Sequence, residues 1–243
     1  MGSTLTGTTS VTLDDSVQLP RLYLAWPTPP DFTKEQAAYD VLSVILADGR
    51  SSRLEKELVY ETQKAYDVSA FNHGQEIAGE FHLTVTAAPG IELESIEVDI
   101  LDQVQNISIT PPSQNEIERA RNRIESYHIQ QLEKIGGFGG RADQLNFYNV
   151  LGDDPELINK DIERYRSVTA EEVSKVAHSL GKDMVRMVVV PRIDKTVSIP
   201  SLDRSKMPKE SGSVSFTPPK PERVELSNGN KILYLNNPQL PIT

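Results

Sequence analysis

The sequence of 243 residues contains no cysteine. Disulfide bridges, thiolate nucleophiles and cysteine metal ligands are therefore excluded, while the redox compartment stays open, because a chain without cysteine suits any compartment. Long apolar runs are also missing. The run VLSVILA, at 41–47, is far shorter than the roughly 20 residues of a transmembrane helix. We therefore expect no transmembrane segment.

Basic residues are in the minority: 25 Lys and Arg stand against 35 Asp and Glu, which gives a formal net charge of −10. Binding to a phosphate backbone requires a basic surface, and no local cluster of Lys and Arg provides one. Nucleic acid is therefore not an expected partner. The opening MGSTLTGTTS has neither the basic region nor the apolar core of a secretory signal, so it leaves the compartment undetermined.

Apolar periodicity predicts a strand, two helices and two further strands in the first half of the chain. Leu22, Leu24 and Trp26 alternate with their neighbours, as in a strand. A helix follows between Thr33 and Gly49, and the spacing of Ser52 and Glu55 predicts a capping box at the start of a second, short helix. Alternation then predicts two paired strands, the first with Tyr66, Val68 and Ala70 on one face and the second with Phe81, Leu83, Val85 and Ala87.

Helical patterns dominate the next hundred residues. Residues 93–104, 113–127, 145–148 and 169–181 carry helical stripes or caps, and a short helix begins at Asp154 and Pro155. The nearly continuous apolar stretch MVRMVVVP, at 184–191, predicts a central strand. This order predicts an α+β fold of two layers, an antiparallel β-sheet with helices packed on one face.

The composition predicts four parts along the chain. We expect an N-terminal tail at 1–16, a domain at 17–192 and a linker rich in Pro, Ser and Lys at 193–220. Residues 221–243 contain Asn-Gly between two apolar stretches and predict a hairpin. Because a lone hairpin is barely stable in water, we expect it to be the first hairpin of a next, truncated domain.

Three stretches carry a resemblance to a known family. They are LADGRSSRLEKELVYETQKAYDVSAF (46–71), GGFGGRADQLNFYNVLGDDPELINKDIERYRSVTAEEV (136–173) and VELSNGNKILYLNNPQLP (224–241). In this order they resemble the pitrilysin and insulinase family of zinc metallopeptidases, the inverzincins. The resemblance implies a fold like that of mitochondrial processing peptidase, and places the chain as the second, non-zinc-binding unit of a tandem array.

The zinc motif of that family, H-x-x-E-H, does not occur in this sequence. The four histidines are His73, His82, His128 and His178, and the nearest match, HGQEI at 73–77, has Ile77 where the second ligand belongs. It also falls at a predicted strand turn, whereas two ligands four residues apart need a helix to share one face. We therefore expect no catalytic residue, no metal ligand and no cofactor here. The resemblance implies zinc in the full-length parent.

A second functional pair of the family is an arginine followed seven residues later by a tyrosine, which the resemblance aligns with Val59 and Tyr66. A valine cannot donate to a developing oxyanion, so the pair is incomplete. Tyr66 remains a weak substrate-binding candidate, and the alternative is a packed strand residue with its hydroxyl at the surface.

Two other features have plain structural explanations. GGFGG, at 136–140, lacks the lysine and the preceding strand of a phosphate loop and is expected to be a hinge between helices. The carboxylates of SIEVDILD (95–102) and DDPEL (153–157) are interpreted as solvated helix faces and caps.

The resemblance implies a non-catalytic substrate-chamber or scaffold domain of a zinc-dependent endopeptidase, in which an upstream H-x-x-E-H unit hydrolyses the peptide bond. The expected partners are the other units of the same tandem peptidase and extended peptide substrates, which pair along a sheet edge. The chain alone is expected to be inactive. The alternative is an assembly or processing-complex subunit of the same family without peptidase activity. Family habit favours the bacterial periplasm or cell envelope.

Overall fold

The computed structural model describes residues 5–181, 183–192 and 220–235. The chain divides into two compact units, residues 1–194 and 195–243, and each is described by itself. Apart from Lys220, the linker predicted at 193–220 lies outside the described residues.

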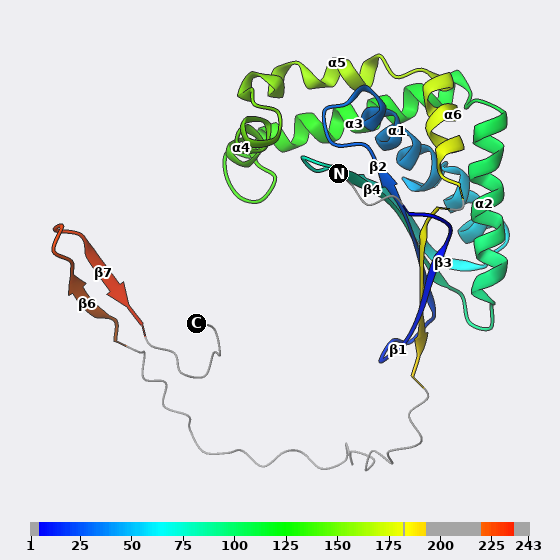
Figure 1. Cartoon of the computed structure of the whole chain (residues 1–243), viewed down its shortest axis with the longest axis horizontal. Coiled ribbons are helices and arrows are strands. Elements are labelled where there is room, and N and C mark those ends of the chain that lie inside the picture. The colour runs from blue at the N-terminus through cyan, green and yellow to red at the C-terminus, as the bar shows by residue number, and fades with distance from the viewer. Residues whose placement is uncertain (1–4, 182, 193–219, 236–243) are drawn as a thin grey trace, which may run out of the picture. The chain divides into compact units, whose positions relative to one another are not determined.

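The first unit contains a five-stranded sheet in the order β1-β5-β2-β4-β3 (Figure 1). Its strands are β1 (Thr9–Asp15), β2 (Arg21–Thr28), β3 (Ala65–His73), β4 (Gly79–Ala87) and β5 (Val185–Pro191). The pairs β5–β2, β2–β4 and β4–β3 are antiparallel, whereas β1 runs parallel to β5. The prediction of a two-layer α+β fold is confirmed, with the correction that the sheet is mixed.

Strand β1 was not predicted, because it lies inside the tail expected at 1–16. Hydrogen bonds from Thr9 N to Met184 O (2.9 Å) and from Arg192 N to Asp15 O (2.8 Å) mark the two ends of its pairing with β5. All seven residues of β1 are exposed, so no alternation of buried and exposed residues reveals the strand in the sequence. Main-chain pairing holds β1 in place.

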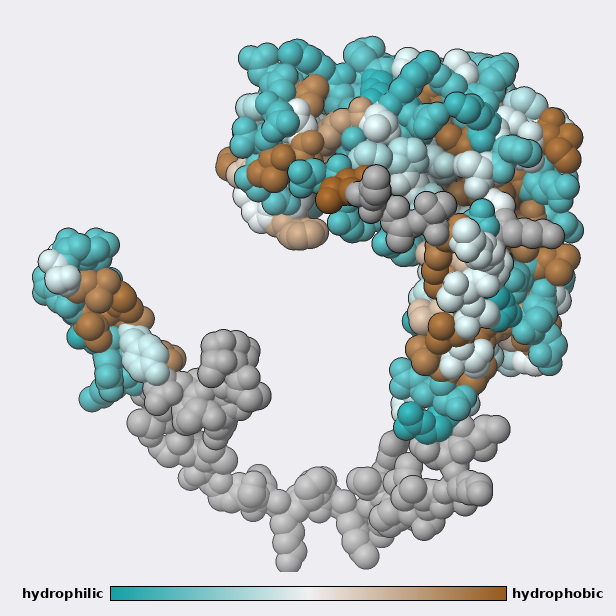
Figure 2. Space-filling view, viewed as in Figure 1, coloured by the Kyte–Doolittle hydropathy of each residue, from teal (hydrophilic) through white to brown (hydrophobic). Residues whose placement is uncertain are grey.

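Helices cover one face of the sheet (Figure 1). Leu22 and Leu24 of β2 and Phe81 of β4 are fully buried on that face, where they pack with apolar residues of the helices. The visible surface of the helical layer is mainly hydrophilic, while apolar residues gather over the strands (Figure 2). The helical elements are α1 (Lys34–Ala47), the π-helix η1 (Glu55–Glu61), α2 (Leu93–Ile109), α3 (Gln114–Glu133), α4 (Arg141–Leu151), the 3₁₀ helix η2 (Pro155–Asn159), α5 (Asp161–Arg166) and α6 (Ala170–Ser179). None of these described helices is long and apolar enough to cross a membrane.

Local capping explains where several helices begin. The capping boxes at Ser113 of α3 and Thr169 of α6 are complete. The box predicted from Ser52 and Glu55 is wrong. The chain forms a π-helix there, and Ser52 Oγ is buried without a hydrogen-bond partner among the described residues. The expected hinge, 136–140, is the loop between α3 and α4, where Gly137 and Gly139 adopt positive φ.

Two predictions of side-chain environment need correction. A β-bulge between Ala65 and Asp67 shifts the register of β3, so Ala65 and Val68 are buried while Tyr66 is 61% exposed. On α2, Glu97 is not solvated. It pairs with Arg186 at 2.6 Å, and both side chains are about 15% exposed.

The second unit contains a hairpin of β6 (Glu222–Glu225) and β7 (Lys231–Tyr234), with Gly229 at φ +83° in its turn. This confirms the hairpin that Asn228 and Gly229 predicted. Every described residue of the hairpin is exposed. That it begins a further domain stays a prediction.

Candidate functional site

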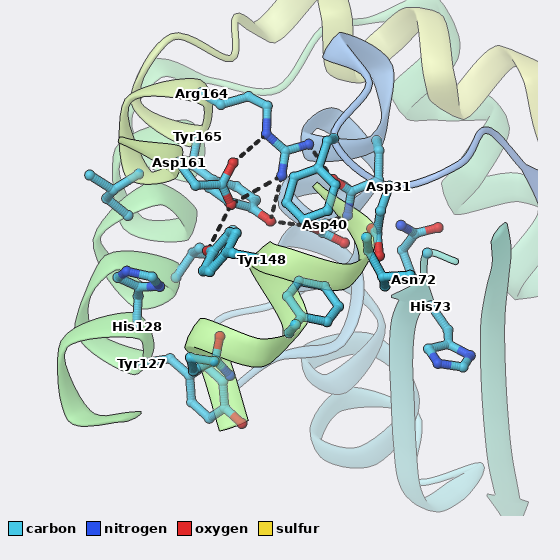
Figure 3. Close-up of a pocket in the computed structure, with 18 of the residues that line it drawn as sticks. Asp31, Asp40, Asn72, His73, Tyr127, His128, Tyr148, Asp161, Arg164 and Tyr165 are labelled. Atoms are coloured by element: carbon cyan, nitrogen blue, oxygen red, sulfur yellow. Dashed lines mark hydrogen bonds and ion pairs between the residues drawn. The ribbon is translucent and has the colours of Figure 1, made fainter. Parts of the chain in front are cut away.

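A cavity of about 510 Å³ lies on the helical side of the first unit, lined by residues of α1, α3, α4 and α5, the loop before α1 and the end of β3. Figure 3 shows polar and aromatic side chains from these separate elements converging on it. Cavities of this size with a few convergent polar groups are the usual form of a small-ligand site. The cavity is therefore the candidate functional site.

An ion pair forms one wall of the cavity. Arg164 donates from Nε and Nη2 to the two carboxylate oxygens of Asp161, at 2.7 and 3.2 Å. Its Nη1 donates to the carbonyl of Thr33 at 3.0 Å and to Oε1 of Gln36. Tyr148 donates its hydroxyl proton to Asp161 at 3.1 Å. Since Arg164 and Asp161 are 17% and 9% exposed, this pair joins α5 to the start of α1 largely away from water.

Asp40 of α1 is a second carboxyl in the same network. Its Oδ2 accepts hydrogen bonds from the Tyr165 hydroxyl at 2.8 Å and from Gln36 Nε2 at 2.7 Å. Burial raises the pKa of Asp40 to about 7, although Tyr165, Asn72 and Arg164 act in the opposite direction. The Asn72 amide nitrogen lowers the pKa of Asp40 from nearby, although it forms no hydrogen bond with a described residue. Asp40 therefore takes up a proton at a much higher pH than an ordinary aspartate.

Asp31, in the loop before α1, differs from the other two carboxylates. Its backbone N–H donates to Gln75 O at 3.0 Å, which ties this loop to the turn after β3. Its carboxylate packs onto Gly74, where an added Cβ would lie 1.8 Å from Oδ1. No described residue forms a hydrogen bond or an ion pair with the carboxylate. Burial raises its pKa, and Arg164 and His73 oppose this only by charge at a distance.

Three aromatic rings form another side of the cavity. The ring of Phe32 lies 5.6 Å from those of Phe147 and Tyr148, and these two are 5.5 Å apart. The Arg164 guanidinium lies over Phe32 at 5.6 Å and over Tyr165 at 5.0 Å. Phe32 itself has φ +60°, a left-handed conformation that costs a non-glycine residue about 1 kcal/mol or more.

The cavity does not fit zinc. His73 is exposed at the end of β3, and its ring lies apart from the Arg164 network in Figure 3. His128 Nε2 lies 3.2 Å from the carbonyl of Ile158. His82, on β4, stacks on Phe71 of β3, and His178 lies on α6. Among the residues that the structure describes, no three His, Asp or Glu side chains are grouped so that they could hold a metal ion.

The aligned pair from the sequence does not meet the cavity. Val59 lies in η1 and packs partly buried against the core, and Tyr66 lies on β3. Neither residue lines the cavity. Sequence analysis singled out none of the charged residues that do, Asp31, Asp40, Asp161 and Arg164. One signal was available, since Asp40 interrupts an otherwise apolar stripe of α1.

Comparison with known proteins gives a consistent result. Residues 3–124, about half of the chain, match the family described as Peptidase M16 inactive domain. The zinc protease PqqE of Helicobacter pylori is 27% identical over 147 residues, which is 59% of this chain and 33% of that protein. The chain therefore spans about a third of the length of this curated relative.

Solved structures agree at the level of the fold. A protease from H. pylori superposes with a TM-score of 0.68 at 19% identity, covering 76% of this chain and 45% of that one. A structure described as the inactive peptidase domain of a zinc protease from Bordetella parapertussis gives 0.65 at 21% identity, covering 77% of this chain and 98% of that one. The periplasmic protease PqqL of Escherichia coli gives 0.60 at 14% identity, covering 76% and 21%.

Proposed function

Because the chain belongs to the family of M16 peptidase inactive domains, we propose that it forms a non-catalytic wall of the substrate chamber in a larger zinc-dependent endopeptidase. Another unit with an H-x-x-E-H helix binds zinc there and hydrolyses the peptide bond. This chain contributes scaffold and peptide-binding surface. The other units of the peptidase and extended peptide substrates are its partners.

The observation that carries this proposal is the inactive-domain family match together with a described part of the chain in which no side chains form a donor set for zinc. The match to the inactive-domain family covers β1 to the middle of α3, while the described histidines lie on separate elements. A tetrahedral catalytic zinc requires three protein ligands that converge on one point. The chemistry of hydrolysis is therefore assigned to a different unit.

Reconstitution tests the proposal. The purified chain is expected to hold less than about a tenth of an equivalent of zinc after dialysis, because a true protein site binds zinc by about 10 kcal/mol or more. It is expected to cleave no peptide alone, and to raise the peptidase activity of the H-x-x-E-H unit encoded with it when the two are mixed. Activity is measured on a quenched fluorescent peptide, with zinc supplied in all samples.

Other outcomes distinguish the alternatives. One equivalent of bound zinc and hydrolysis by the chain alone contradict the proposal. A complex with an encoded partner that has no H-x-x-E-H motif and no peptidase activity supports the assembly or processing subunit instead.

For compartment we propose the bacterial cell envelope, supported by the periplasmic PqqL of similar fold, and cell fractionation tests it.

Strand β1 is the sheet edge that we propose for pairing with an extended peptide. All its residues are exposed, and it lies at the end of the strand order. The N–H of Thr9 and the C=O of Asp15 point to β5, so by the two-residue period of a strand the N–H and C=O of Thr12 point away from β5. No described residue forms a hydrogen bond with these two groups of Thr12, which can therefore pair with a substrate strand. Tyr66, exposed on the opposite edge strand β3, is a weaker proposed contact.

Thr12→Pro is expected to weaken binding of a labelled, unstructured peptide about tenfold, because it removes an outward N–H and places a proline ring on the edge. The β1–β5 pairing is expected to survive, since proline is tolerated on an edge strand whose N–H faces outward. Fluorescence anisotropy measures the affinity. Thr12→Val, which keeps the N–H, is the matched control. Equal affinities for the two variants would show that β1 is not the docking edge.

A further inference from the structure

The charges around the cavity do not balance. Asp31, Asp40 and Asp161 face it with a single guanidinium, that of Arg164. Arg164 is committed to Asp161 through two hydrogen bonds, and Asp40 is satisfied by Tyr165 and Gln36. One carboxylate, Asp31, is left over. A partly buried carboxylate without a partner raises the free energy of the folded chain unless a cation or a donor reaches it.

A second unsatisfied acceptor lies on the same lining. Gln131 Oε1, on α3, is buried and has no hydrogen-bond partner among the described residues. Asp31 and Gln131 come from segments a hundred residues apart in the sequence and both line the cavity, and Gln131 Oε1 itself lies beside Gly139 in the loop after α3. Buried polar atoms in native structures nearly always find partners. Asn72 Nδ2, a donor on the same lining, is also without a partner among the described residues, so the Asp31 carboxylate is the group that favours an occupant that donates hydrogen bonds.

The aromatic lining indicates that this donor is an organic cation. The faces of Phe32, Phe147 and Tyr148 favour a guanidinium or ammonium within about 6 Å of a ring centre. Arg164 is an example of such a cation in this structure. Its guanidinium pairs with the Asp161 carboxylate and also lies over the rings of Phe32 and Tyr165. The left-handed backbone conformation of Phe32 is strained, and such strain persists where the surrounding structure requires that conformation. A small metal ion is disfavoured, because the described carboxylates and histidines form no group that could hold one.

We propose that this cavity binds the side chain of a lysine or arginine in a peptide, with Asp31 as its counter-ion and the Phe32 cluster as its apolar contact. The inference rests on the proposed function, since it identifies which peptides the chamber wall prefers. About 510 Å³ is ample for one long side chain together with water. The cavity then gives this non-catalytic domain a preference for binding peptides that contain a basic residue.

Matched peptides test the proposal. Two labelled, unstructured peptides differ only at one central residue, arginine in one and citrulline in the other, and both carry an acetylated amino end and an amidated carboxyl end. Citrulline keeps the shape of arginine and removes the charge, and the blocked ends exclude capture of a terminal amine. Anisotropy with the full 243-residue chain is expected to give at least about tenfold tighter binding for the arginine peptide, a free-energy difference of 1.4 kcal/mol.

Asp31→Asn is expected to remove this preference while the affinity for the citrulline peptide stays unchanged. Asp102→Asn is the matched control, because Asp102 is exposed on α2 and outside the cavity. Gly74→Ala provides a second route to the same effect, since its Cβ displaces the Asp31 carboxylate without removing the charge. Thermal unfolding of each variant verifies that it is folded before binding is compared.

The results separate the two proposals. Arginine preference that is lost in Asp31→Asn and kept in Asp102→Asn supports the cavity. Equal binding of both peptides, or a preference that survives Asp31→Asn, overturns the cavity proposal and leaves the chamber role standing. No binding of either peptide, by a chain that still stimulates the zinc unit, overturns the cavity proposal and the peptide-binding part of the proposed function together.

Discussion

Arg164→Leu is expected to lower the free energy of unfolding by about 3–5 kcal/mol, the usual cost of removing one partner from a buried ion pair. The substitution leaves Asp161, which is 9% exposed, without a counter-charge, and it removes donors from the Thr33 carbonyl and Gln36 Oε1. These contacts connect α5 to the start of α1, so we expect the helical layer to loosen as a unit. Urea unfolding followed by far-UV circular dichroism measures the change.

Arg166→Leu is the matched control for this prediction. Arg166 lies two residues later on the same helix and pairs with Glu125 and Glu163, but its side chain is 48% exposed. Exposed pairs contribute about 1 kcal/mol or less. The double variant Arg164→Leu with Asp161→Leu is expected to recover part of the loss, because it removes both charges. An equal, small effect of Arg164→Leu and Arg166→Leu would contradict the assignment of Arg164 as the central connection.

Stability is expected to fall by about 2 kcal/mol as pH rises from 4 to 7, and Asp40→Asn is expected to remove most of this fall. The folded state raises the pKa of Asp40 to about 7 from its ordinary 3.8. Between these values the folded state binds more protons than the unfolded state, so stability decreases with rising pH and levels off above pH 7. A pKa difference of this size corresponds to about 4 kcal/mol at full burial. Because Asp40 is partly exposed, water screens its charge and reduces this contribution to about 2 kcal/mol.

Unfolding curves at several pH values, for the wild type and Asp40→Asn, measure this effect. The other carboxylates act in separable ways. Burial also raises the pKa of Asp31, so a weaker slope of the same sign is expected to remain in the variant. Arg53 and the α3 cap hold the pKa of Glu116 at about 2, so the stability it provides is lost only below about pH 4.5. Parallel pH profiles for the two proteins would show that Asp40 does not titrate in this range.

Trp26 shows what periodicity in the sequence was able to predict. It was placed on a strand with Leu22 and Leu24, and it is 2% exposed on the covered face of β2. Its indole N–H also donates to the Gly181 carbonyl at 2.9 Å, a contact 155 residues away that no local pattern reveals. Local pattern decides which face of a strand is buried, whereas the partner of a polar tip depends on how distant segments meet.

By itself the sequence determined the two-layer fold, the starts of the helices capped by Thr33, Ser113 and Thr169, the hairpin at 222–234 and the absence of the H-x-x-E-H motif. Each follows from residues within one or two turns of each other, where spacing fixes geometry. The tertiary structure decided the rest. It paired β1 with β5, turned Tyr66 outward at a bulge and brought Asp31, Asp40, Asp161 and Arg164 to one cavity. Charged residues look alike along a chain, and only packing decides which of them leave water and meet a partner.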